Sequence, residues 1–102
     1  MSSWIPNFCT LKRASPKIDF GFSLASNNKM HKIVNITVNS IADLAGLRND
    51  DTILEVNGKS IHNTDHELAK QKMRENPNEI TMLVVADYDK YIESIIINQK
   101  IF

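Results

Sequence analysis

Cysteine, glycine and proline are scarce in this 102-residue sequence, which contains one, three and three of them, and its formal net charge is zero. With Cys9 alone, the chain cannot close an internal disulfide, and this usage is typical of proteins in a reducing compartment. The 12 basic residues balance the 12 acidic ones, which argues against non-specific binding to nucleic acid or to an anionic membrane. The composition therefore points away from disulfide-stapled proteins and from polyanion-binding proteins.

Long hydrophobic runs are also missing. The longest strongly apolar run near the C-terminus is Ile95-Ile96-Ile97, whereas a membrane-spanning helix needs roughly 20 apolar residues. The first residues, Met1–Pro6, lack the basic and apolar regions of a secretory signal peptide. We therefore expect a cytoplasmic protein with no direct membrane insertion.

The chain is long enough for one compact domain, and a domain of this size can fold without disulfides. Alternating apolar residues, turn signals and helix caps predict six short strands and two helices. The strands are expected at residues 8–13, 20–24, 32–38, 52–56, 59–61 and 79–86, and the helices at residues 40–45 and 63–75. The predicted fold is therefore mainly β, a six-stranded and partly open antiparallel barrel or sandwich capped by two α-helices.

Local capping and turn signals support this assignment. Ser40 is suited to cap the first helix through its side-chain oxygen. Asn57-Gly58 is typical of a tight hairpin turn, because both residues tolerate a positive φ. Thr64 and Glu67 form a capping-box pattern at the start of the second helix, and Asn76-Pro77 ends that helix.

Two further assignments depend on hydrophobic periodicity. Val34, Ile36 and Val38 alternate along the third strand and are expected on one face of it. In the terminal segment, residues 88–102, apolar side chains recur near helical spacing and predict an extra helix, but Ile95–Ile97 fits a strand equally. Periodicity leaves both alternatives open for this segment.

The residues Asp19-Phe20-Gly21-Phe22 are the first candidate binding element. A glycine between two aromatic residues, leading directly into a strand, allows consecutive backbone N–H groups to point at one place, and such a nest binds a carboxylate. The two phenylalanines would wall an apolar pocket beneath it. The second helix adds positions 66, 70 and 73 on one face, and a groove between that face and the strand would admit an extended peptide by β-strand addition.

A third stretch, Ser40–Gly58, reads SIADLAGLRNDDTILEVNG and closely resembles part of the PDZ domain family. In that family a short helix precedes AGL, an acidic turn follows, and ILEVNG forms the next strand and turn. Phe20-Gly21-Phe22 resembles the family's carboxylate-binding loop at the correct distance upstream, and Asp65-His66-Glu67 resembles the start of its second helix. The resemblance covers about residues 8–88 in the right order and is strongest for the Na+/H+ exchanger regulatory factor type of multi-PDZ scaffold.

The resemblance implies a binding site for the last residues of a partner protein. His66 would accept a hydrogen bond from a Ser or Thr hydroxyl two residues before the ligand's end, a preference called class I. The backbone N–H groups of Phe20, Gly21 and Phe22 would hold the terminal carboxylate, the side chains of Phe20, Phe22, Leu24 and Met73 would line the pocket for the last side chain, and Ser23 and Lys70 would form the rim of the groove.

Several residues depart from the family's usual pattern, and Asp19 and Lys70 are the two that bear on ligand binding. Asp19 stands where many members have glycine or another small neutral residue, and its carboxylate would weaken the binding of another carboxylate. Lys70 replaces an apolar groove residue, but its alkyl stem can cover the groove while the ammonium reaches water. The lysine therefore favours ligands with acidic residues upstream of the terminus, and Arg13 or Lys17 would add positive charge near the carboxylate.

The resemblance also implies a role and a domain organisation. It predicts an N-terminal extension at residues 1–7, a PDZ domain at residues 8–88 and a C-terminal extension at residues 89–102. The domain would be an adaptor near the N-terminus of a longer scaffold, binding the C-terminal tails of membrane proteins such as transporters, channels or receptors. It would be cytoplasmic and membrane-associated through these partners, and we expect no enzymatic activity, no cofactor, no metal and no nucleic-acid ligand.

Two alternatives remain open. The apolar end, Ile101-Phe102, would fill the groove of its own or a neighbouring copy in a self-associating module, although Lys100 lies where class I binding requires Ser or Thr. A metal enzyme would use His62 and His66 as ligands, but the sequence has no HExxH pattern, no clear third ligand and no set of nucleophile, base and orienting acid.

Overall fold

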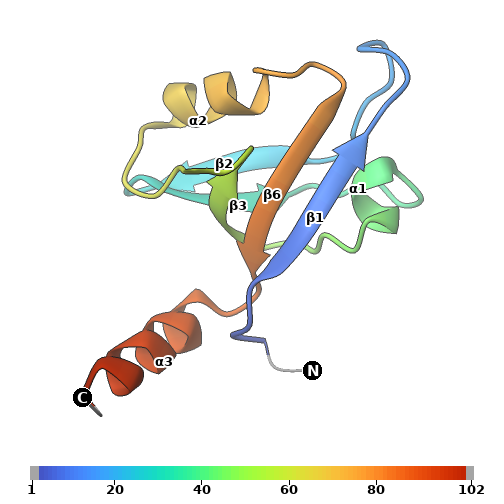
Figure 1. Ribbon diagram of the computed structural model, residues 1–102. Helices are drawn as coiled ribbons and strands as arrows, with labels where there is room; N and C mark the ends of the chain where they lie inside the picture. Colours follow the sequence, from blue (N-terminus) through green and yellow to red (C-terminus); the bar gives the residue numbers. More distant parts are fainter. Residues whose placement is uncertain (1–2, 101–102) are drawn as a thin grey trace.

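The computed structural model describes residues 3–100, with side chains through residue 97, and Figure 1 shows how its elements are arranged. The dipeptide Ile101-Phe102, on which the self-association alternative depends, lies outside the described residues. The strands are β1 (Asn7–Lys12), β2 (Ser23–Asn27), β3 (Met30–Val34), β4 (Thr52–Val56), β5 (Lys59–Ser60) and β6 (Glu79–Val85). The helices are α1 (Ile41–Leu44), α2 (His66–Met73) and α3 (Tyr88–Lys100).

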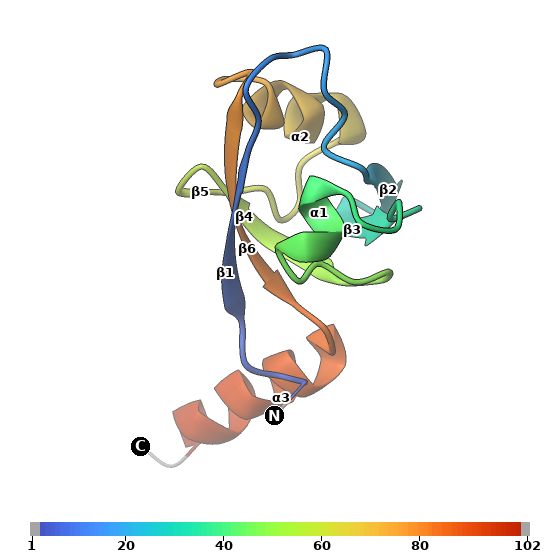
Figure 2. The same cartoon turned by 90° about the vertical axis from the view of Figure 1, so that its right-hand side faces the viewer.

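All of these strands belong to one antiparallel sheet, which confirms the predicted mainly β architecture. The sheet order is β1-β6-β4-β3-β2, and β5 pairs with β4 as a short hairpin. In its register, Cys9 lies opposite Met82 between β1 and β6, and Leu24 lies opposite Ile33 between β2 and β3. Figure 2 shows that the sheet curls, with β1 and β6 on one side, β2 and β3 on the other, and α2 across the upper opening.

The hydrophobic core fills the inside of this curl. Its fully buried apolar strand side chains are Leu11, Ile33, Ile53, Val56, Met82 and Val85, each at most 2% exposed. Burying one such side chain contributes roughly 1.5–3 kcal/mol. Ala69 and Met73 of α2 pack into the same cluster. The helix is therefore fixed to the core by one face, while another face is free to line a groove.

The third strand differs from its prediction. Val34, Ile36 and Val38 were expected on one face of this strand, and this prediction is wrong. The strand ends at the first of these residues, since Asn35 adopts a positive φ of 54° and leaves the extended conformation. The buried side chains of β3 are Ile33 and His31, and Val38 is 79% exposed. The inward face is thus offset by one residue from the apolar alternation, and a histidine takes a core position.

Most of the predicted local signals are confirmed. Ser40 caps α1, because its Oγ accepts the N–H three residues further on at 3.2 Å, and Asn57-Gly58 turns with positive φ at both residues. The predicted capping box of Thr64 and Glu67 is wrong. Asp65 caps α2 instead, since its carboxylate accepts the N–H three residues further on at 2.8 Å, while Thr64 donates its hydroxyl to a backbone carbonyl.

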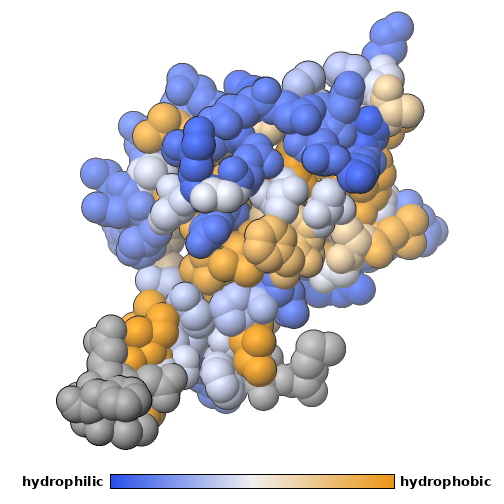
Figure 3. Space-filling model, in the orientation of Figure 1, coloured by the Kyte–Doolittle hydropathy of each residue, from blue (hydrophilic) through white to orange (hydrophobic). Residues whose placement is uncertain are grey.

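The terminal segment is a helix, which settles the alternative between helix and strand. α3 projects from the end of the domain opposite α2 (Figure 1), and the ring of Tyr88 stacks on His62 with centroids 6.1 Å apart. Ile96 and Ile97 are exposed on it, and Figure 3 shows hydrophobic atoms there and over the middle of this face, whereas hydrophilic side chains cover the end that carries α2. Within residues 3–100, no helix is long and apolar enough to cross a membrane.

His31 is an unusual core residue, because it is titratable and only 1% exposed. Its ring is satisfied by hydrogen bonds to Ser26 on one side and to Thr64 on the other, at 2.7 and 2.9 Å. Burial lowers the pKa of His31 by disfavouring the charged imidazolium. The folded domain therefore holds this histidine neutral at physiological pH.

We expect the free energy of unfolding to fall as the pH is lowered from 8 to about 5.5. Histidine ordinarily has a pKa of about 6.5, and the pKa of His31 in the fold lies lower, so between the two values the unfolded chain binds a proton that the folded domain does not. Urea unfolding at several pH values will measure this slope, and His31→Leu should flatten it. His62→Gln, at an exposed histidine, is the matched control and should leave the slope in place; a slope unaffected by His31→Leu would contradict this assignment.

Candidate functional site

The candidate site lies along the free edge of β2. This strand is the last in the sheet order, so its outer edge has no strand partner among the described residues. α2 packs beside β2 (Figure 1), and most residues of this strand are exposed. The backbone N–H and C=O groups of that edge are therefore open to pairing with an added strand.

A pocket of about 190 Å³ opens where this edge begins, between α2 and the loop before β2. It brings together all four apolar residues that the sequence predicted for it. Phe20 and Met73 are each 8% exposed, and Phe22 and Leu24 are half-buried. The other lining residues are charged, namely Arg13, Asp19, Lys70 and Arg74.

The loop before β2, residues 20–22, is held from behind by backbone hydrogen bonds. The carbonyl of Phe20 accepts the N–H of Ala42, and the carbonyl of Gly21 accepts the N–H of Thr37, both at 2.9 Å. These carbonyls therefore point toward α1 and the turn before it. Among the residues that the structure describes, the N–H groups of Phe20 and Phe22 have no hydrogen-bond partner.

Gly21 is required at its place in this loop. Its φ is +93°, and a Cβ atom there would overlap the side chain of Ser40, so only glycine allows the loop to approach the start of α1 this closely. The N–H of Gly21 donates to Oδ1 of Asp19 at 2.8 Å. A carboxylate of the protein itself thus occupies one of the three N–H groups that were predicted to hold a ligand's carboxylate.

Arg13 brings positive charge to the pocket, as one of the two predicted candidates. Its guanidinium carbon lies 4.2 Å from the centre of the Phe20 ring, and its N–H groups donate to backbone carbonyls of two separate loops at 2.8 and 2.9 Å. Lys17, the other candidate, does not line the pocket, whereas Arg74 does and was missed. Its spacing of four residues from Lys70 within the predicted helix, residues 63–75, was the signal that could have identified it.

His66 is the first residue of α2 and is half-buried. Its Nδ1 lies 2.7 Å from Oγ of Ser26 on β2, and the same Oγ lies 2.7 Å from Nδ1 of His31. Sequence reasoning missed both of these partners. Period-two alternation from Leu24 could have placed Ser26 on the side facing α2, but its contact with His31 depends on the register between β2 and β3.

The two predicted rim residues lie on different elements. Ser23 is exposed at the start of β2, which begins three residues later than predicted, and it does not line the pocket. Lys70 does line the pocket from α2, and its ammonium lies 3.6 Å from a glutamate one turn earlier. Together with Arg13 and Arg74, it gives the pocket three cationic side chains against the one carboxylate of Asp19. The lining of the pocket therefore carries a net positive charge, which suits an anionic group.

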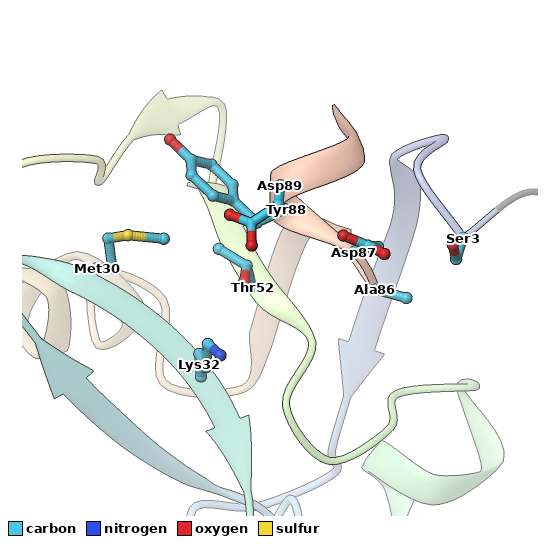
Figure 4. A pocket seen from close by; sticks show the side chains of 8 residues that line it. All are labelled: Ser3, Met30, Lys32, Thr52, Ala86, Asp87, Tyr88 and Asp89. Carbon is cyan, nitrogen blue, oxygen red and sulfur yellow. The ribbon is translucent and has the colours of Figure 1, made fainter. Parts of the chain in front are cut away.

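A second hollow, of about 380 Å³, lies between β3, β4 and the start of α3. Figure 4 shows Lys32 and Thr52 on its strand side and Asp87 and Asp89 on its helix side. Most of its lining residues are polar, so it lacks the apolar wall of the first pocket. Across residues 3–97, no three His, Cys, Asp or Glu side chains are grouped to hold a metal ion.

The histidines named above as metal ligands and the one cysteine, a potential nucleophile, lie in different places. His62 stacks on Tyr88 near α3, whereas His66 bonds to Ser26 in the groove. Cys9 is buried, and burial raises the pKa of its thiol, which disfavours the reactive thiolate. These groups therefore do not combine into a nucleophile and base.

Known proteins resemble this chain over the same region. A sequence profile of the PDZ domain matches residues 9–85. The Na(+)/H(+) exchange regulatory cofactor-like protein nrfl-1 of Caenorhabditis elegans is 28% identical over 83 residues, which are 80% of this chain and 18% of the worm protein. The crystal structure of the second PDZ domain of Dlg1 from the choanoflagellate Monosiga brevicollis matches with a TM-score of 0.71 and 25% identity, over 81% of this chain and 100% of that one. Because the profile covers most of the sequence, this chain belongs to the PDZ domain family.

Proposed function

We propose that this domain binds the C-terminal tails of partner proteins in the groove between β2 and α2. PDZ domains are peptide-binding interaction modules, and they add an extended peptide as a strand to a sheet edge. The observation that carries the proposal is the unpaired edge of β2, which begins beside an apolar pocket and a loop with free N–H groups. Main-chain hydrogen bonds to this edge would supply affinity, and the pockets along it would supply specificity.

The ligand's terminal carboxylate would be held by the N–H groups of Phe20, Gly21 and Phe22. The carbonyls of this loop are engaged toward α1, so a carboxylate would meet donors there. Arg13 adds positive charge at the same end of the groove. Asp19 opposes binding, because its carboxylate already accepts the Gly21 N–H and the ligand must displace or share that contact.

The side chains of the ligand would be sorted by the period of an extended strand. In such a strand, the last residue and the residue two positions before it project to the same side. The last side chain would enter the pocket lined by Phe20, Phe22, Leu24 and Met73, which suits an apolar group. The earlier side chain would then meet His66, which would accept a hydrogen bond from Ser or Thr and give the class I preference.

The rim would add a preference for charge. Lys70 lies half-buried on α2 and would attract acidic residues upstream of the ligand's terminus, and Ser23 on β2 would form another part of the rim. Salt screens such surface attractions beyond roughly 8 Å at physiological ionic strength. The preference would therefore be confined to ligand residues that lie close to the groove.

The wider role is inferred from the relatives. The C. elegans protein is named as an Na(+)/H(+) exchange regulatory cofactor-like protein, and this chain spans 18% of its length. We infer that residues 8–88 are one PDZ unit of an adaptor or scaffold, flanked by extensions at residues 1–7 and 89–102. Its partners would be tails of membrane proteins such as transporters, channels or receptors, and the domain would be cytoplasmic and reach the membrane through them.

Fluorescence titration with C-terminal peptides tests the binding site. Free-acid peptides that end in Ser or Thr, any residue and Leu should bind with micromolar dissociation constants. Such constants correspond to a binding free energy of about −8 kcal/mol. Amidated copies should lose binding, because the amide removes the charge and directs an N–H group at the N–H groups of the loop. Equal binding of acid and amide, or no binding of either, would contradict the carboxylate site, and a molecular mass that rises with protein concentration would then favour self-association.

Replacing Asp19 should tighten peptide binding. Asp19→Ala removes a like charge and frees the Gly21 N–H, so calorimetric titration should show an affinity about three- to ten-fold higher. Asp19→Asn removes the charge but keeps an acceptor for this N–H. The affinity of this variant should therefore lie between that of the unmodified domain and that of Asp19→Ala. Asp89→Ala on α3 is the matched control and should change nothing; a loss of affinity in Asp19→Ala would show that Asp19 supports the loop and does not compete.

A further inference from the structure

A line of side-chain contacts connects the groove to the core behind it. Nδ1 of His66 lies 2.7 Å from Oγ of Ser26, and this Oγ lies 2.7 Å from Nδ1 of His31. Nε2 of His31 continues the line to the backbone oxygen of Thr64 at 2.9 Å. The line therefore runs from the first residue of α2, through β2 and β3, and back to the turn before α2.

The direction of these hydrogen bonds is set at Thr64. A carbonyl oxygen can only accept, so Nε2 of His31 carries a proton and donates it there. The Thr64 hydroxyl lies 3.2 Å from the same nitrogen, but it gives its own proton to the carbonyl of Ile61 at 2.6 Å. Both acceptors therefore require the Nε2–H form of His31.

The remaining protons follow from the neutral state of His31. This side chain is 1% exposed, and desolvation by burial is the main reason that its pKa lies below the ordinary value. Neutral His31 with its proton on Nε2 has a lone pair on Nδ1, which accepts the hydroxyl proton of Ser26. Ser26 has no second proton, so its contact with Nδ1 of His66 needs a proton on that nitrogen.

We propose that His31 and Ser26 are positioning residues that hold neutral His66 with its proton on Nδ1 and leave the lone pair of Nε2 for the ligand. This histidine relay, His66–Ser26–His31, rests on the proposed function, in which His66 accepts a hydrogen bond from a Ser or Thr hydroxyl. With the proton on Nε2, His66 would instead present a donor to that hydroxyl. The class I preference would thus depend on a buried histidine that does not touch the ligand.

Two residues of the relay lie on the paired strands β2 and β3. Ser26 and His31 are direct partners across β2 and β3, so the register of the sheet sets their separation. Ser26 lies two residues after Leu24, which lines the pocket, and its side chain therefore projects to the same side of β2. The residues that fix the tautomer are accordingly held by the same strand that would pair with the ligand.

The tautomer can be measured in the free domain, independently of any ligand. Long-range 1H–15N spectra of 15N-labelled histidine distinguish protonated from unprotonated ring nitrogens, and pH 8 lies above the ordinary histidine pKa of about 6.5. We expect the proton of His66 on Nδ1 and that of His31 on Nε2. Ser26→Ala and His31→Leu should each move the His66 proton toward Nε2, Ser26→Thr should restore the original spectrum by keeping the hydroxyl, and Ser94→Ala on α3 is the matched control.

Peptide affinities provide the second readout. For a free-acid peptide with Thr two residues before its end, Ser26→Ala and His31→Leu should weaken binding about three- to ten-fold. For the same peptide with Val at that position, both variants should keep the affinity of the unmodified domain, because no hydroxyl meets His66. A distorted groove would weaken both peptides alike, so the difference between them isolates the relay from a structural effect.

Several results would overturn the relay. These are a His66 proton on Nε2 in the unmodified domain, a proton that stays on Nδ1 in Ser26→Ala, or equal losses for the Thr and Val peptides. If the spectra change as expected but no free-acid peptide binds, then Ser26 and His31 do fix the tautomer of His66, and the proposed ligand is wrong. The two proposals therefore fail in distinguishable ways.

Discussion

Among the described residues, strand β2 pairs with another strand along one edge, and the candidate groove residues lie around its other edge. α2 lies beside this edge and is anchored by Ala69 and Met73, which belong to the core. The edge begins at a loop whose Gly21 fits against Ser40 at a φ of +93°. An open edge is a place where strands of other chains can add, and here the strand is only five residues long. The domain therefore offers a short and well-bounded template for one added peptide strand.

The groove also has a chemical direction. At the start of β2, loop N–H groups and Arg13 favour a negative charge, and the apolar pocket lies directly beside them. Further along β2, Ser26 bonds to His66 and marks the place for a hydrogen-bonded side chain. In the proposed mode of binding, a ligand that satisfies both ends would bring its carboxylate, an apolar side chain and a hydroxyl in that order. Asp19 would compete with the carboxylate of such a ligand, since its own carboxylate already accepts the N–H of Gly21.

Much of the fold could be predicted, because its signals act over a few residues. The cap at Ser40 and the turn at Asn57-Gly58 depend on side chains and φ values within one turn of the chain, and the structure confirms both. The inward face of β3 could not be predicted in the same way. Asn35 leaves the extended conformation at a positive φ, so the apolar residues beyond it do not continue the strand: Ile36 packs against the core from outside the sheet, and Val38 is exposed.

In the candidate site, too, the features that depend on neighbouring residues could be predicted, and the contacts between strands could not. The apolar pocket residues and His66 could be named from the loop sequence and from helical spacing, together with the resemblance to the PDZ family. The contact between Ser26 and His31 could not be predicted, because it depends on the register of two strands. A histidine in a strand sequence also usually indicates an exposed position, whereas His31 is buried. The cap of α2 was misassigned by one residue, since Asp65 and Thr64 both offer a side-chain oxygen and the backbone geometry decides between them.

Backbone amide chemical shifts, followed by NMR during titration with a free-acid peptide, test most directly whether the ligand adds to β2. A peptide strand on this edge should change the amide signals of residues 20–26 most, should extend to the first turn of α2, and should leave α3 unaffected. Changes concentrated on α3 and on the hollow at its base, with residues 20–26 unaltered, would contradict a binding groove between β2 and α2.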